Sequence, residues 1–367
     1  MLGIHVNALD EEATMSKKMR AIIKPEAGPG LVMTEVDIPP VGRHDALVKV
    51  KATSICGTDL HIYKWDPWAR ERIRPPIIVG HEFCGTVVQV GEDVSEVAVG
   101  DYVSGDSHVV CHHCVQCRTG REHICQNTQI VGVDRDGCWA EYIVLPASGL
   151  WINPPGLPPE IASLQDNFGN AVHTALATSL SNRCVLVTGC GPVGLMAIAV
   201  AKAAGARKVF ATDISPYRLA LARRMGADRA YNVAEVDVVS EIKRETEGNG
   251  VDVLLEMSGA ASAIDQGFSA LAYGGEAALL GLASAPIPFD INNHIVFKGA
   301  TVRGIVGRKL WETWYQMRAL LNSGAVDLRP LVTHRFMLDD FEEALRVMGS
   351  GHSGKVVMYV DKESLST

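Results

Sequence analysis

The spacing of hydrophobic and polar positions changes near residue 184 and divides the chain into two regions. The first region contains short alternating runs broken by proline and glycine. Residues 46–52 (ALVKVKA) are typical of these runs and predict a strand with one buried face. The second region alternates apolar runs with helical segments, which is typical of a parallel sheet. The pattern therefore predicts an α/β protein with a β-rich first part and a doubly wound second part.

The same patterns predict individual elements. Strands are expected over residues 86–90, 140–146, 184–188, 251–257, 275–282, 300–305 and 354–360. Helices are expected over residues 195–204, 217–225, 262–271 and 311–323, with another that begins near Glu160. The last helix should return the chain to the first region, and the last strand should complete the β-structure there.

Residues 184–213 read as strand, glycine turn, helix, strand and acid. Within GCGPVG, Gly189 permits a tight turn, Gly191 lets the backbone approach a pyrophosphate, and Gly194 allows close packing of helix and strand. The free amides at the helix start favour an anion. Asp213 ends the second strand, where its carboxylate can accept hydrogen bonds from an adenosine ribose. The stretch predicts a dinucleotide site, whereas an isolated glycine pattern would predict only a strand-to-helix turn.

Composition narrows the class of protein. A length of 367 residues suggests about two domains, and the net charge of −8 argues against a nucleic-acid partner. The chain has no apolar run long enough to span a bilayer, and its opening residues lack a signal-peptide core. We therefore expect a cytoplasmic protein without a membrane partner.

Four of the nine cysteines lie close together in the sequence, namely Cys111, Cys114, Cys117 and Cys125. In a chain without a secretion signal, this spacing favours a metal over disulfides. Four thiolates form a closed tetrahedral zinc site, which would fold a loop that has no core of its own. The alternative is a loop with four free thiols.

A second set of candidate ligands is dispersed along the chain. Cys56 follows one predicted strand, and the pair His81-Glu82 precedes another; each lies next to a glycine. Together they would leave a fourth coordination position open, as a catalytic zinc requires. Taken singly, Cys56 fits a buried apolar residue better than a metal ligand, and His81 fits a core histidine with satisfied hydrogen bonds better. Spacing alone leaves these alternatives open.

Together these motifs resemble the zinc-dependent medium-chain alcohol dehydrogenases, over residues 19–360. The resemblance rests on GHE (80–82), CGTD (56–59), the four-cysteine loop and the GCGPVG turn. Longer matches resemble the L-threonine 3-dehydrogenases of that family, namely WDPW (65–68), FGNAVHT (168–174), LEMSG (255–259), IVGR (305–308) and ETWY (312–315). The resemblance implies a GroES-like catalytic domain of residues 19–167, completed by 312–367, and a Rossmann domain of residues 168–311. Residues 1–18 would form a flexible extension without a family counterpart.

The resemblance also implies roles for individual residues. Cys56, His81 and Glu82 would hold a catalytic zinc, and the four clustered cysteines a structural one, so two zinc ions per chain are expected. The implied catalytic residues are Thr58 and His61, as a proton relay, and Asp166, as an acid near the catalytic metal. The implied NAD contacts are Gly189, Gly191, Val193, Gly194, Asp213, Arg218, Leu280, Gly281, Leu282, Ile305 and Val306. One departure is Asn167, which stands where related sequences have proline.

The activity that the resemblance implies is NAD-dependent oxidation of L-threonine at its 3-hydroxyl, to 2-amino-3-oxobutanoate, by a homotetramer. Three other functions fit parts of the pattern: oxidation of another secondary alcohol such as a polyol or butanediol, a binding protein without catalysis, and a zinc-ribbon nucleic-acid module. The intact open ligand set opposes the second, and the acidic charge opposes the third. For single residues, Thr58 could instead cap a helix, Asp166 could be an exposed loop acid, and Arg218 could only decorate its helix.

Overall fold

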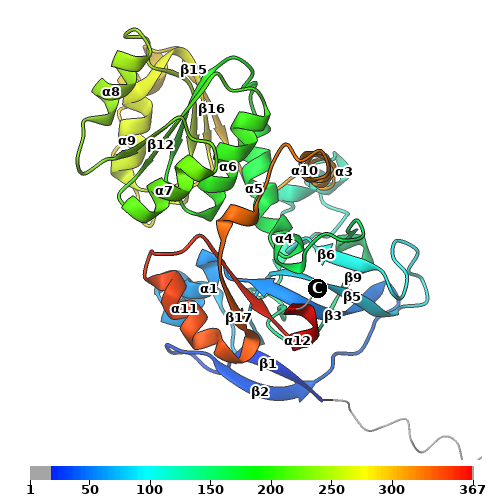
Figure 1. Cartoon of the computed structure of the whole chain (residues 1–367). Coiled ribbons are helices and arrows are strands. Elements are labelled where there is room, and N and C mark those ends of the chain that lie inside the picture. Colours follow the sequence, from blue (N-terminus) through cyan, green and yellow to red (C-terminus); the bar gives the residue numbers. More distant parts are fainter. Residues whose placement is uncertain (1–17, 366–367) are drawn as a thin grey trace, which may run out of the picture.

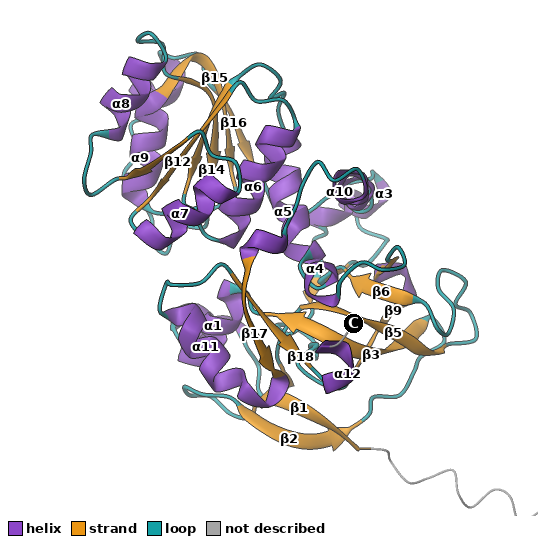
Figure 2. Ribbon diagram, viewed as in Figure 1, coloured by secondary structure: helices purple, strands orange, loops and turns teal. Residues whose placement is uncertain are grey.

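The computed structural model describes residues 18–365, which form two lobes joined through a group of helices (Figure 1). One lobe is rich in β-structure and the other contains a parallel sheet flanked by helices, which confirms the predicted α/β class (Figure 2). The predicted N-terminal extension lies outside the described residues, except for Lys18, which is the first residue of β1. No helix among residues 18–365 is long and apolar enough to cross a bilayer.

A seven-stranded sheet forms the centre of the β-rich lobe, in the order β10-β6-β5-β3-β18-β17, with β9 also paired to β3. Its strands are β3 (Asp45–Ser54), β5 (Glu82–Val90), β6 (Tyr102–Gly105), β9 (Tyr142–Pro146), β10 (Leu150–Ile152), β17 (Val332–Met337) and β18 (Lys355–Tyr359). Two small sheets combine β1 (Lys18–Lys24) with β2 (Val32–Asp37) and β4 (Ile77–Ile78), and β7 (His108–Val109) with β8 (Gln129–Ile130). The helices of this lobe are α1 (Gly57–Lys64), α2 (Pro67–Arg72), α3 (Val115–Arg118), α4 (Pro159–Ala162), α11 (Phe341–Gly349) and α12 (Lys362–Leu365).

The last part of the chain returns to this sheet, because β18 pairs antiparallel with β3. The sequence predicts a strand with one buried face in β3, and the structure confirms it: Val48 and Val50 are fully buried, and Lys49 between them is exposed. The return supports the proposed first domain of residues 19–167 completed by 312–367.

The second lobe contains six parallel strands in the order β13-β12-β11-β14-β15-β16. The strands are β11 (Cys184–Thr188), β12 (Lys208–Asp213), β13 (Arg229–Asn232), β14 (Val251–Glu256), β15 (Leu271–Leu279) and β16 (Thr301–Gly304). Its helices are α6 (Pro192–Ala203), α7 (Pro216–Arg224), α8 (Val238–Glu245) and α9 (Ala261–Ala270). This strand order is that of the dinucleotide-binding doubly wound fold, and β11 at its centre is buried throughout.

Helices α5 (Gln165–Leu176) and α10 (Glu312–Asn322) lie where the two lobes meet (Figure 1). The alternative that Asp166 is an exposed loop acid is wrong, because Asp166 is in the first turn of α5 and is 5% exposed. The FGN segment after it is helical as well, and Gly169 packs closely on Arg308, since a Cβ there would lie 2.6 Å from Arg308 Cδ. Strand β15 is also shorter than predicted at its end, so Leu280 begins a loop.

Candidate active site and metal centres

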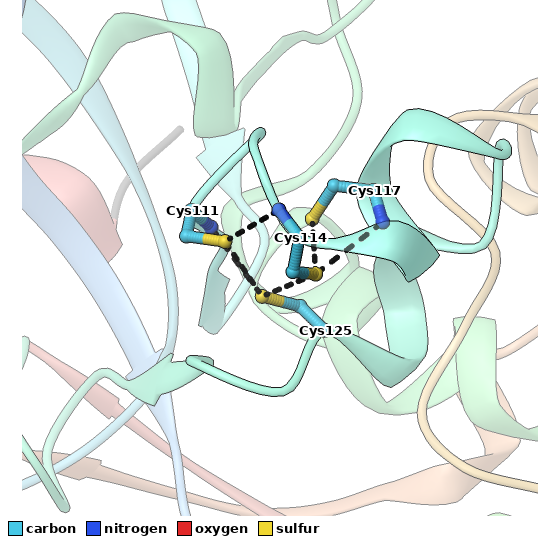
Figure 3. Close-up of side chains that lie close together, drawn as sticks. All are labelled: Cys111, Cys114, Cys117 and Cys125. Atoms are coloured by element: carbon cyan, nitrogen blue, oxygen red, sulfur yellow. Dashed lines mark hydrogen bonds between the residues drawn. The ribbon is translucent and has the colours of Figure 1, made fainter.

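The four clustered cysteines bring their sulfur atoms together at one point (Figure 3). The Sγ atoms of Cys114 and Cys117 are 3.5 Å apart, those of Cys111 and Cys125 also 3.5 Å, and those of Cys114 and Cys125 3.8 Å. Disulfide sulfurs are about 2.05 Å apart. Tetrahedral zinc, with sulfurs at about 2.3 Å, separates its ligands by about 3.8 Å. The cluster therefore fits a closed four-thiolate zinc site.

Backbone and side-chain amides support the charged form of two of these sulfurs, those of Cys111 and Cys114. Cys114 caps α3 and accepts a hydrogen bond from the Cys117 amide, while Asn127 Nδ2 donates to Cys111 Sγ. The Asn127 hydrogen bond is the largest of the effects that lower the pKa of Cys111 to about 5. A thiolate is the form that binds metal, so Cys111 and Cys114 are favoured as ligands, whereas burial raises the pKa of Cys117 to about 12 and a metal would have to displace its proton.

The open set also assembles in space. Cys56 lies at the start of α1, just after β3, while His81 and Glu82 lie at the start of the neighbouring strand β5. Their donor atoms all lie within 4.8 Å of one another. The turn before them requires Gly80, with φ of 87°, because a Cβ there would lie 2.0 Å from the Trp139 ring. Three donors of these types leave room for a fourth ligand.

Buried charges hold His81 and Glu82 in place. Asp59 Oδ1 faces His81 Nδ1 at 3.6 Å and has no exposed surface. Burial lowers the pKa of His81, but the charges of Asp59 and Cys56 outweigh it and raise the pKa to about 10. Burial also opposes the charge of Glu82, but its ion pair with Lys355 keeps its pKa lowered. The raised pKa of His81 reflects nearby groups that favour a positive charge at this point, and a bound metal ion would supply that charge in place of the His81 proton.

The two residues expected to relay a proton lie one turn apart on α1. Thr58 Oγ1 lies 4.0 Å from Cys56 Sγ, and His61 Nδ1 lies 2.5 Å from Asp66 Oδ2. Helix α1 begins at Gly57 with Cys56 as its N-cap, so Thr58 is not the cap residue. The His61 side chain is 58% exposed. Thr58 is thus close to the open set, and His61 reaches solvent.

Asp166 is held in a buried charged cluster. Its Oδ1 pairs with Arg308 at 2.6 Å and accepts a hydrogen bond from the Ser107 amide. Arg308 also binds Asp106 through two hydrogen bonds of 2.7 Å. Burial raises the pKa of Asp166 to about 6, although the Arg308 charge opposes this shift. The structure excludes the alternative of an exposed loop acid.

The glycine turn has the conformation that its spacing suggests. Gly189 has φ of 86°, and a Cβ on Gly194 would lie 1.9 Å from the Gly189 carbonyl oxygen. Gly191 is the N-cap of α6, and a Cβ there would project into open space. The turn is therefore tight on one side and open on the side where a pyrophosphate could approach. These features fit a dinucleotide.

The other expected cofactor residues lie at the carboxyl ends of the parallel strands. Asp213 ends β12, and its two oxygens accept hydrogen bonds from the amides of Cys190 and Ser215. The remaining candidates follow β15 and β16 in loops, namely Leu280, Gly281, Leu282, Ile305 and Val306. Ligands of open α/β sheets bind at this edge.

A cavity of about 490 Å³ joins the two candidate sites. Cys56, His61 and Asn167 line one side, and Val193 and Arg218 line the other. Arg218 Nε is buried and has no hydrogen-bond partner among residues 18–365. Cys56 of the open ligand set and Pro192-Val193 of the GCGPVG turn therefore line one shared space.

Sequence reasoning missed the residues that support the site. Asp59, Lys355 and Ser54 contact the open set or its neighbours, and Arg308 appeared only within the IVGR match. A signal was present in two cases. Lys355 begins an otherwise apolar strand, and Asp59 follows the cysteine of CGTD. A charged residue next to a buried strand needs a partner, but the sequence does not say which.

Comparison with known proteins agrees with this geometry. The family model "Alcohol dehydrogenase GroES-like domain" matches residues 42–155, and the model "Zinc-binding dehydrogenase" matches residues 192–323. The chain is 52% identical to the L-threonine 3-dehydrogenase of Pyrococcus horikoshii, over 94% of this chain and 99% of that protein. It is 49% identical to the L-threonine 3-dehydrogenase of Symbiobacterium thermophilum, over 95% and 99%.

Among solved structures, a zinc-binding dehydrogenase from Sinorhizobium meliloti bound to NADP has a TM-score of 0.86. It is 28% identical, and the match covers 94% of this chain and 99% of that one. The curated relatives match nearly the whole chain at about half identity, and they agree with the two family models. They also agree with a fold that contains a four-thiolate cluster, an open ligand set and a glycine turn. The chain is therefore an oxidoreductase that belongs to the zinc-dependent alcohol dehydrogenase family.

Proposed function

We propose that this enzyme oxidises L-threonine at its 3-hydroxyl to 2-amino-3-oxobutanoate, with NAD as the hydride acceptor. The observation that carries the proposal is the cavity that joins the open ligand set to the glycine turn. The substrate assignment is supported by the L-threonine 3-dehydrogenases that match the chain over nearly its whole length.

Two metal positions follow from the donor sets. Cys56, His81 and Glu82 would hold a catalytic zinc, and Cys111, Cys114, Cys117 and Cys125 a structural one. When bound at the open set, Zn²⁺ supplies a Lewis acid that makes loss of the substrate hydroxyl proton easier near neutral pH. NAD supplies the hydride acceptor. The protein orients the substrate and the cofactor and supplies charged groups around them.

The chain's own residues would move the proton. A hydroxyl can donate and accept at once, so Thr58 can take the substrate proton while passing its own towards His61. Asp66 Oδ2, at 2.5 Å, orients the His61 ring, and the exposure of that ring lets the proton leave to water. Asp166 would act at the inner end of the site, where Arg308 and Ser107 fix one of its oxygens.

NAD would lie along the cavity. Gly189, Gly191 and Gly194 would admit its pyrophosphate, and Asp213 its adenosine ribose. The further contacts would come from Val193, Arg218, Leu280, Gly281, Leu282, Ile305 and Val306. We assign these residues to a Rossmann domain of residues 168–311.

The assembly is proposed to be a homotetramer. Strand β16 lies at the edge of the parallel sheet, and all four of its residues are exposed. The apolar side chains of Val296, Phe297 and Tyr273 are also more than half exposed in this lobe. An unprotected edge of this kind readily pairs with another chain.

The nine free thiols support a reducing, cytoplasmic setting.

The substrate assignment is tested by a panel of alcohols. Formation of NADH, followed by absorbance, is expected to be fastest with L-threonine, with kcat/KM at least about a hundredfold above sorbitol, 2,3-butanediol and ethanol. The reason is that a site built for an ammonium and a carboxylate leaves its own polar groups unpaired with the other alcohols. A higher kcat/KM for butanediol or sorbitol than for L-threonine would contradict the assignment and identify that alcohol as the better substrate.

The metal assignment predicts two zinc ions per chain by elemental analysis. Cys56→Ser should retain one zinc and its fold but lose turnover. Cys114→Ser should lose the structural zinc and unfold at a lower temperature, because metal binding supplies much of the folding energy of that loop. Cys84→Ser serves as the control, since Cys84 belongs to neither set, and it should retain both ions. Wild-type protein with one ion or none, despite zinc in the buffer, would refute this assignment.

The position of Asp213 predicts a preference for NAD over NADP. Its charge repels a 2′-phosphate, while Arg218 offers some attraction, so we expect a kcat/KM ratio of about a hundredfold, or about 2.8 kcal/mol. Asp213→Asn should reduce this ratio. Asp237→Asn, which changes an acid to an equally good helix cap in the same lobe, should leave it unchanged. Equal kcat/KM for the two cofactors in the wild type would contradict the role of Asp213.

A further inference from the structure

Asn167 places a buried amide against two of the three residues of the open ligand set. Its side chain is 4% exposed, and its Nδ2 lies 2.5 Å from Glu82 Oε1 and 3.6 Å from Cys56 Sγ. A carboxylate and a thiolate only accept hydrogen bonds, so the NH₂ end of the amide must face them. We propose that Asn167 is a positioning residue that holds Glu82 and Cys56 in their metal-binding geometry.

The hydrogen bonds of Glu82 explain why one amide matters. A carboxylate has about four acceptor positions. Ser54 Oγ and Lys355 Nζ both bind Oε2, and Asn167 Nδ2 takes one position on Oε1. One position on Oε1 is left for a metal. Glu82 has no exposed surface in the intact protein, and a leucine at position 167 would fill the space of the amide, so in Asn167→Leu this oxygen loses a donor that water cannot replace.

The helix that carries Asn167 is itself anchored. In the preceding residue, Asp166, Oδ1 is fixed by Arg308 and the Ser107 amide, and the carbonyl oxygen accepts a hydrogen bond from Arg308. The following residue, Phe168, has no exposed surface. The Asn167 amide is therefore preorganised on a rigid turn, as residues that orient metal ligands usually are.

The oxygen end of the amide gives no reason for an asparagine at this position. Asn167 Oδ1 is buried and has no hydrogen-bond partner among residues 18–365, which is unfavourable. A leucine of similar shape would avoid that unpaired acceptor. The benefit of the amide must then lie in what its NH₂ group holds, namely Glu82 and Cys56.

The test measures zinc release and does not depend on turnover; it rests on the proposed zinc at the open set. Wild type, Asn167→Leu and Asn167→Ala are loaded with zinc and mixed with the chelator 4-(2-pyridylazo)resorcinol. The two release phases are assigned with Cys56→Ser, which lacks the open-set ion. Gln165→Leu is the matched control, because Gln165 is a buried amide on the same helix turn that bonds Ser104 and Asn153 instead.

Both Asn167 variants should release the open-set zinc about 10- to 100-fold faster, with the four-thiolate phase unchanged. The control should release both ions at wild-type rates. Open-set release within twofold of wild type in both Asn167 variants would overturn the proposal. Faster loss of both ions together would also overturn it, since Asn167 would then act on the whole lobe. A wild type that binds no open-set zinc would instead refute the proposed metal site.

Discussion

The arrangement of the site depends on one buried cation where the two lobes meet. Arg308 follows β16, the last strand of the parallel sheet, and its side chain is 1% exposed. A desolvated guanidinium is unfavourable unless it is paired and fully hydrogen-bonded. Its partners are Asp106, after β6 of the other lobe, and Asp166 on α5. Breaking this cluster would leave unpaired charges in an apolar interior, which is unfavourable. The cluster therefore holds the two lobes and α5 in one relative position.

The catalytic geometry follows from that constraint. Because Arg308 fixes the start of α5, the same helix turn places Asp166 and Asn167 beside the ends of β3 and β5, where the open ligand set lies. The opposite side of the cavity is formed by the glycine turn and α7, at the carboxyl edge of the parallel sheet. The proposed reaction requires the metal that binds the substrate hydroxyl and the hydride acceptor to face each other. The interface between the lobes provides that arrangement, which neither sheet provides alone.

Much of this could be predicted from the sequence, since local patterns decide it. The glycine turn, the strand β11 and the four cysteines each depend on residues that are close together in the chain. The buried supports could not be predicted, because pairs such as Glu82 with Lys355 join residues far apart in the sequence. Strand β13 and helix α8 were also missed, since β13 (RAYN) is short and polar. The burial of Asp166 could not be predicted either, because its contacts with Arg308 join residues far apart in the sequence.

We propose that a metal at the open set and a dinucleotide at the glycine turn share one cavity. Anomalous X-ray scattering at the zinc edge, from crystals grown with zinc and NAD, would locate both ligands in one experiment. We expect two zinc peaks per chain, one among Cys56, His81 and Glu82 and one among the four clustered cysteines. The nicotinamide ring of NAD should lie beside the first peak. A nicotinamide bound elsewhere, or no peak among Cys56, His81 and Glu82, would contradict it.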